Sequence, residues 1–174
     1  MKTIIIIPSR MASTRFPGKP LVKIAGIPMV QRVWQQAISS NIGEVYVACS
    51  EIEVSDLING LGGKAILTDP NLPSGTDRVC SAFQCLPNSS EIECIINLQG
   101  DMPLINPDHI KKVIDPIKKN YSIGTLATNL KKEEYSNSNV TKVNVDWKEK
   151  NIGTALDFFR LKNQIDKNVY HHVG

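Results

Sequence analysis

The segment IIIIPSRMASTRFPGKPL, residues 4–21, decides how the rest of the chain is interpreted. Its four isoleucines predict a strand that is buried on both faces, as in a parallel sheet covered by helices. Three cations, Arg10, Arg15 and Lys19, follow this strand in a segment that also holds three prolines. Because guanidinium and ammonium groups suit phosphate oxygens, we expect a stiff loop that binds a strongly anionic ligand. A solvated turn with surface ion pairs is the alternative.

Short apolar runs alternate with helical patterns along the rest of the chain. Strands are predicted at residues 44–49, 64–68, 93–99, 122–128, 141–146, 153–159 and from 168, and helices at 27–40, 50–61, 79–86 and 106–119. This alternation predicts an α/β fold, with a mostly parallel sheet and helices on both faces. In such sheets ligands bind beyond the carboxyl ends of the strands, so residues 9–19 and 99–103 are expected at one edge.

Polar residues mark the expected starts of several helices. Ser50 and Glu53 have the S-x-x-E spacing of a capping box, and Asn106 precedes Pro107 as a cap would. The helix at 27–40 is expected to bury Met29, Val33, Ala37 and Ile38, which recur at helical spacing.

Length and composition exclude several classes of protein. A chain of 174 residues predicts a single domain, 1–174, and its net charge of +3 without a basic stripe argues against nucleic acid as a partner. No apolar stretch is long enough to span a membrane, and the first residues do not resemble a signal peptide. The four cysteines lack metal-binding spacing and are expected to be reduced and mostly buried, as in a cytoplasmic protein.

The segment NLQGDMP, residues 97–103, places a carboxylate at the end of a predicted buried strand. Asp101 at such a position can bind Mg²⁺ against phosphates, and Gly100 would let the backbone approach a ligand closely. The alternative is that Asp101 only caps a turn. The segment SGTDR, residues 74–78, also allows two interpretations. Ser74 or Thr76 would cap a helix, and the N-terminus of that helix could in addition hold a base or a phosphate.

Taken together, these motifs resemble a known family. The segments at residues 6–33, 74–78 and 97–105 are similar in sequence, order and interval to the 3-deoxy-manno-octulosonate (Kdo) cytidylyltransferases, the CMP-Kdo synthetases of lipopolysaccharide synthesis. Residues 137–146 and 171–174 resemble later segments of the same family. The first motif is also similar to the sialic-acid cytidylyltransferases, and the combination with SGTDR and NLQGD favours Kdo.

The resemblance implies a Rossmann-like nucleotide-diphospho-sugar transferase fold and a reaction in which CTP and Kdo give CMP-Kdo and pyrophosphate with Mg²⁺. It implies that Arg15, Lys19 and Asp101 are catalytic, and that Asp101 binds the metal. It also implies contacts to the substrates by a larger set, namely Arg10, Ser13, Ser74, Gly75, Thr76, Arg78, Gln99, Lys142 and His172. Lys142 and His172 match positions near the sugar site.

The chain departs from the family pattern at several positions. Met102 stands where the family usually has Glu, and Cys49–Ser50 replaces the usual Thr–Asp. Family members continue past residue 174, into a part that would supply a second metal-binding aspartate and the helices of a homodimer. We therefore expect a truncated domain whose C-terminal strand leaves an unpaired edge of the sheet. Another CMP–sugar-acid synthetase and a non-catalytic CTP-binding remnant remain as alternatives.

Overall fold

The computed structural model describes residues 1–11, 17–162 and 168–173 and divides into two compact units, Met1–Lys111 and Lys112–Gly174. The sequence predicts one domain over residues 1–174. Because this depends on how the two units are joined, it stays a prediction. Ser13 and Arg15 lie outside the described residues.

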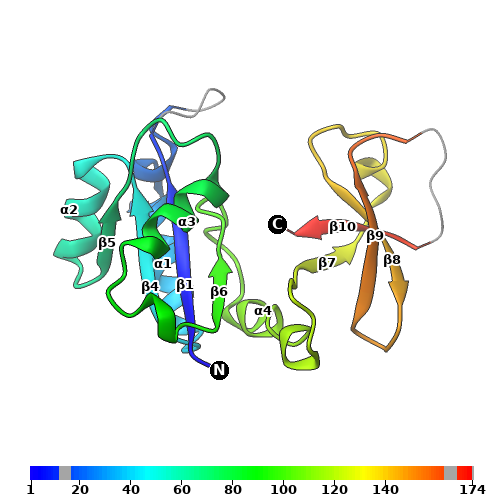
Figure 1. The fold of residues 1–174 in the computed structure, drawn as a ribbon. Helices are drawn as coiled ribbons and strands as arrows, with labels where there is room; N and C mark the ends of the chain where they lie inside the picture. The colour runs from blue at the N-terminus through cyan, green and yellow to red at the C-terminus, as the bar shows by residue number, and fades with distance from the viewer. Residues whose placement is uncertain (12–16, 163–167, 174) are drawn as a thin grey trace. The chain divides into compact units, whose positions relative to one another are not determined.

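The first unit contains a four-stranded parallel sheet (Figure 1). Its strands are β1 (Thr3–Ser9), β4 (Glu44–Cys49), β5 (Lys64–Leu67) and β6 (Cys94–Asn97), in the order β5-β4-β1-β6. All three pairings are parallel, as the alternation of strands and helices predicted. A two-stranded hairpin, β2 (Lys23–Ile24) and β3 (Ile27–Pro28), precedes the first helix. The N-terminal motif therefore starts at a central strand of the sheet.

Helices cover both faces of this sheet. They are α1 (Met29–Ser39), α2 (Ile52–Gly60) and α3 (Gly75–Gln84), followed by α4 (Pro107–Lys112) at the end of the unit. Ile4 and Ile6 of β1 pack with Val79 and Ala82 of α3, and Figure 1 shows α3 crossing that face. Ile5 is fully buried as well, and because side chains alternate along a strand it points to the opposite face. Burial on both sides explains the unbroken isoleucine run.

The helices predicted at 27–40, 50–61 and 79–86 are confirmed in type, whereas the one predicted at 106–119 forms only over Pro107–Lys112. In α1 the buried residues are Val30, Val33 and Ala37, whereas Ile38 is 50% exposed. The expected burial of Ile38 is therefore wrong. Asn106 accepts a hydrogen bond from the backbone N–H of Asp108 at 2.9 Å, which confirms this cap.

The capping box expected at Ser50 and Glu53 is also wrong. Helix α2 begins after Glu51, whose side chain makes no cap hydrogen bond. The Ser50 hydroxyl instead donates to Oε1 of Glu51 at 2.7 Å. Competition from this neighbouring carboxylate removes the hydroxyl from the helix terminus, where the S-x-x-E spacing would have placed it.

The second unit contains an antiparallel sheet. Its strands are β7 (Leu126–Asn129), β8 (Lys142–Trp147), β9 (Gly153–Phe159) and β10 (Val169–Val173), in the order β7-β10-β8-β9. These strands do not extend the parallel sheet, so that sheet ends with the four strands of the first unit. Strand β10 pairs with β7 on one side and with β8 on the other. The unpaired sheet edge expected at the C-terminal strand is therefore wrong, because β10 lies inside its sheet.

Short 3₁₀ helices connect these elements at Lys19–Leu21, Ser89–Glu91, Ile117–Lys119 and Lys132–Glu134. Within the described ranges, no helix is both long enough and apolar enough to cross a membrane. All four cysteines are free, but only Cys49 is buried, and Cys80 and Cys85 are exposed. The expectation of mostly buried thiols is therefore wrong. Cys80 lies on the exposed part of α3, and Cys85 is the residue that ends this helix.

Candidate functional site

The carboxyl ends of the four parallel strands form the edge where the predicted site residues of the first unit gather. Lys19 follows β1, Asp101 follows β6, and their side chains form an ion pair with Nζ and Oδ2 2.7 Å apart. The two side chains keep 35% and 52% of their exposure. A segment 82 residues further along the chain thus meets the cationic loop, as the parallel topology predicts.

Gly100 allows the two segments to approach each other, whereas the sequence predicted a close approach between this backbone and a ligand. A Cβ atom at Gly100 would lie 2.5 Å from the carbonyl oxygen of Pro8, closer than any side chain tolerates. The glycine therefore lets the segment after β6 pack against the backbone of β1. The close approach is to the protein's own chain, and it brings Asp101 to the edge.

The base of the cationic loop is held by backbone hydrogen bonds at Met11. The N–H of Met11 donates to Oε1 of Glu51 at 3.1 Å, and its carbonyl oxygen accepts from the N–H of Gly18 at 3.0 Å. Gly18 has a φ of 74°, a conformation that glycine adopts without strain. The loop is therefore closed at its base, and Lys19 follows directly after that base.

The SGTDR segment forms the N-terminus of α3. The backbone N–H of Asp77 donates to Oγ of Ser74 at 3.1 Å, so Ser74 is the helix cap. A Cβ at Gly75 would lie 3.4 Å from Cγ of Pro8, which places this helix start close to the end of β1. Thr76 is exposed on the first turn. The structural role expected for Ser74 is confirmed, and the exposed Thr76 is accessible to a ligand.

Arg78 is the most deeply buried cation of this edge, with 1% of its surface exposed. One guanidinium nitrogen, Nη1, donates to the hydroxyl of Thr68, which in turn donates to the carbonyl of Cys49 at 3.0 Å. Burial lowers the pKa of Arg78, the negative charge of Glu51 opposes that effect, and the positive charge of Arg10 adds to it. The site thus concentrates positive charge in a place with little solvent, which favours an anion.

Buried polar atoms without a partner gather at the same edge. Among the described side chains these atoms are Oγ of Ser9, Nε1 of Trp34, Oε2 of Glu51, Nη2 of Arg78 and Oδ1 of Asn97. All except the Trp34 nitrogen lie at or just beyond the carboxyl end of a parallel strand or on α3 above it. Because buried polar groups are nearly always hydrogen-bonded, these atoms indicate a ligand or water site.

Arg10 and Gln99 follow β1 and β6 closely. Arg10 is exposed and Gln99 is half-buried, so both can reach a ligand at this edge. The remaining predicted residues of the loop, Ser13 and Arg15, lie outside the described residues.

Lys142 and His172 belong to the second unit. Lys142 is fully buried, and its ammonium group donates to the carbonyl oxygens of Asn137 at 2.7 Å and Arg160 at 2.6 Å. These bonds give Lys142 a structural role. Nε2 of His172 lies 2.8 Å from the hydroxyl of Thr125, and burial lowers the pKa of this imidazole. Contacts of either residue with a substrate stay a prediction.

Asp101 is the carboxylate of this edge that the sequence predicts for a metal ion. No group of three or more His, Cys, Asp and Glu side chains forms a metal centre in the described part of the chain. Asp101 is a half-exposed oxygen donor beside the predicted phosphate site, which fits a Mg²⁺ ion that takes one or two carboxylates and otherwise binds substrate phosphates. The residues fit an ion that arrives with a polyphosphate.

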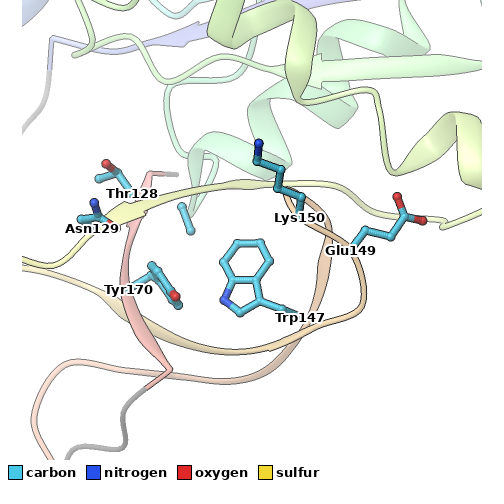
Figure 2. Close-up of a pocket in the computed structure, with 7 residues that line it drawn as sticks. Thr128, Asn129, Trp147, Glu149, Lys150 and Tyr170 are labelled. Atoms are coloured by element: carbon cyan, nitrogen blue, oxygen red, sulfur yellow. The ribbon is translucent and has the colours of Figure 1, made fainter.

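A hollow of about 460 Å³ lies on the antiparallel sheet of the second unit (Figure 2). Its lining residues are Ala127, Thr128, Asn129, Trp147, Glu149, Lys150 and Tyr170. The rings of Trp147 and Tyr170 meet edge to face at 5.1 Å between centroids. None of the predicted site residues that the structure describes lines this hollow.

Glu51 and Thr68 belong to the site and were missed in the sequence. Glu51 holds the base of the cationic loop, and Thr68 holds the guanidinium group of Arg78. Both residues follow a parallel strand, β4 and β5 respectively. The rule that placed the other site residues, that ligands bind at the carboxyl ends of the strands, therefore could have found them as well.

Comparison with known proteins identifies the family. Residues 4–172 match the cytidylyltransferase family. The 3-deoxy-manno-octulosonate cytidylyltransferase of Paramagnetospirillum magneticum is 41% identical over 175 residues, which cover 98% of this chain and 71% of that protein. The enzyme of the same name from Rickettsia bellii is 40% identical over 170 residues, covering 96% of this chain and 68% of that protein. The chain thus spans about seven tenths of the length of these relatives.

Solved structures agree with the sequence comparison. The structure of CMP:2-keto-3-deoxy-manno-octonic acid synthetase complexed with CTP superposes with a TM-score of 0.84 at 32% identity, covering all of this chain and 72% of that one. A nucleotidyl transferase from Methanothermobacter, 14% identical with a TM-score of 0.53, shares the Rossmann-like fold. Cytidylyltransferases generally use a divalent metal ion. The chain is a nucleotidyltransferase that belongs to the 3-deoxy-manno-octulosonate cytidylyltransferase family.

Proposed function

We propose that this chain transfers CMP from CTP to Kdo, giving CMP-Kdo and pyrophosphate for lipopolysaccharide synthesis, at the carboxyl edge of its parallel sheet. The observation that carries this proposal is the convergence of Lys19, Asp101 and the buried Arg78 at that edge, beside buried polar atoms that lack partners. The names of the relatives, and the CTP with which the similar solved synthetase is complexed, indicate the substrates.

The nucleotide is proposed to lie between the cationic loop and the start of α3. Arg10 and Lys19 would neutralise its phosphates, with Ser13 and Arg15 of the same loop. Ser74, Gly75, Thr76 and Arg78 would surround the nucleotide, and Gln99 would contact nucleotide or sugar. Since Lys19 already pairs with Asp101, the phosphates would replace the carboxylate as partner of the ammonium group. Lys142 and His172 are proposed near the sugar, by their family positions alone.

The proposed reaction is a direct displacement and forms no covalent enzyme intermediate. The anomeric hydroxyl oxygen of Kdo attacks the α-phosphorus of CTP in line, and the bond from that phosphorus to the β-phosphate oxygen breaks. Pyrophosphate leaves with the bonding electrons, and the hydroxyl proton passes to water. Positioning and charge neutralisation by Arg15 and Lys19 lower the barrier.

Magnesium is the proposed metal. When bound, it would neutralise phosphate charge and lower the pKa of the attacking hydroxyl. Asp101 would hold it, since Mg²⁺ prefers oxygen ligands and usually takes one or two carboxylates together with substrate phosphates.

Pyrophosphate release measured with CTP, Mg²⁺ and a sugar acid tests the proposal. Release with Kdo and little release with N-acetylneuraminate supports a CMP-Kdo synthetase, and the reverse preference supports a sialic-acid type of synthetase. Binding of CTP without release in the presence of either sugar acid would contradict turnover. The homodimer that the resemblance implies for the full-length family, and the cytoplasmic location, stay predictions.

A further inference from the structure

Glu51 is a carboxylate at a site that otherwise collects cations. It follows β4 as the cap residue of α2, and its nearest partners lie on the cationic loop and on the neighbouring residue Ser50. On charge alone, a carboxylate beside an anion-binding site weakens binding, because like charges repel. The position of Glu51 must therefore have an explanation other than attraction of the anion.

The two oxygens of Glu51 are used differently. Oε1 accepts from the backbone N–H of Met11 at 3.1 Å and from the hydroxyl of Ser50 at 2.7 Å. Oε2 is buried and has no hydrogen-bond partner among the described residues. One oxygen therefore fixes the base of the cationic loop, while the other stays available for a bound molecule or a water.

Arg78 shows the complementary arrangement. Nη1 is bonded to Thr68, while Nη2 is buried without a partner in the described ranges. Glu51 is the strongest negative influence on this guanidinium group and opposes the burial that lowers the pKa of Arg78. A charged acceptor and a charged donor therefore share this edge, and each has one buried atom unpaired.

We propose that Glu51 is a positioning residue for the nucleotide, which holds the base of the cationic loop through Met11 so that Lys19 reaches the phosphates. This inference rests on the CTP binding proposed above. The anchored base includes Gly18, because the carbonyl of Met11 accepts a hydrogen bond from the N–H of Gly18. Lys19, the proposed phosphate-binding cation, follows directly in the chain. One carboxylate thus links the loop to the start of α2.

The decisive property is the sign of the effect on CTP affinity. Glu51→Gln removes the charge and keeps an acceptor oxygen, so a carboxylate that only repels the ligand would give tighter binding when replaced. A positioning residue gives weaker binding instead, and we expect the Kd for CTP to rise about tenfold, the factor that corresponds to one charge-assisted contact. Glu53→Gln is the matched control, because Glu53 is an exposed carboxylate in the first turn of the same helix.

A milder variant guards against a folding defect. Ser50→Ala removes only the hydroxyl that holds Oε1 of Glu51. We expect a Kd about threefold higher, because Glu51 keeps its hydrogen bond to Met11. Both variants and the control are also melted without ligand, so that loss of fold is separated from loss of affinity.

The experiment is equilibrium binding of CTP to the full chain, measured for the wild type, Glu51→Gln, Ser50→Ala and Glu53→Gln well below their melting temperatures. Weaker binding by the first two variants, with Glu53→Gln at or below the wild-type Kd, supports the proposal. Wild-type or tighter affinity for both Glu51→Gln and Ser50→Ala overturns it, even if their melting temperatures fall. Failure of the wild type itself to bind CTP would overturn the proposed function as well.

Discussion

Lys19 and Asp101 form a 2.7 Å ion pair that joins the loop after β1 to the segment after β6. Both side chains are partly exposed, so the pair itself contributes little to stability. Function explains the pair better than stability does. The ammonium group and the carboxylate lie where a polyphosphate and its metal ion would bind. The pair is expected to open when CTP binds.

Lys19→Met should weaken CTP binding and leave the fold intact. Loss of one charge-assisted phosphate contact is expected to cost about 1.5–3 kcal/mol of binding, whereas loss of an exposed ion pair costs about 0.2–1 kcal/mol of stability. The control is Lys64→Met, because Lys64 pairs with Glu44 at 2.5 Å at the amino ends of β4 and β5. Isothermal titration and thermal melts measure both quantities. If Lys19→Met lost as much unfolding free energy as binding free energy, Lys19 would have a structural role instead.

Asp101→Asn should reduce only the part of CTP binding that depends on Mg²⁺. The amide keeps the size of the side chain and loses the charge that attracts the ion. Without metal, binding should stay unchanged or become tighter, because Lys19 is released from its partner. Titrations of CTP with Mg²⁺ and with a chelator check this, beside Glu44→Gln as an ion-paired carboxylate of the opposite edge. An equal loss under both conditions would remove Asp101 from the metal site.

Gly100→Ala should destabilise the first unit and damage the site. Its Cβ would meet the carbonyl oxygen of Pro8 at 2.5 Å, and because that oxygen is backbone, the chain must shift. We expect a loss of about 1–3 kcal/mol of unfolding free energy, together with weaker CTP binding. Gly60→Ala is the control, since nothing lies within 4 Å of its Cβ. Denaturant unfolding of both variants gives the comparison, and equal stability would show that the contact relaxes freely.

His172 should titrate below the ordinary histidine pKa of 6.5 because its imidazole is partly buried and lies near His171. The folded state then binds fewer protons than the unfolded state at pH values just under 6.5. Stability from this residue is present above about pH 6.5 and is lost as the pH falls through the lower, folded pKa. Histidine NMR resonances give the pKa, and His172→Asn should flatten the dependence of unfolding free energy on pH between about 5 and 7. A pKa at or above 6.5 would contradict the burial effect.

The sequence predicted those parts of the fold that depend on neighbouring residues. The isoleucine run of β1 and the caps at Ser74 and Asn106 are local patterns, and the structure confirms them. Helix α3 begins at Gly75, four residues before the apolar pattern at Val79. The Ser50 capping box failed because one neighbouring carboxylate took the hydroxyl.

The parts that depend on distant contacts could not be predicted in the same way. Glu51 binds Met11, which is 40 residues away in the chain, and no motif marks the pair. Strand β10 lies between β7 and β8, so its pairing depends on segments that precede it by more than 20 residues. The burial of Lys142 likewise follows from carbonyl groups on two separate segments. Only the folded chain brings these groups together.

The central claim is that CTP binds at the carboxyl edge of the parallel sheet. The most direct measurement is a titration of the isotope-labelled chain with CTP, followed by backbone amide NMR. If CTP binds there, the largest shifts occur at Arg10, Lys19, Gly75 and Asp101, with small shifts at Glu44 and Lys64 at the amino ends of the strands. Shifts centred on the opposite edge, or on Trp147 and Tyr170 at the hollow of the second unit, would contradict it.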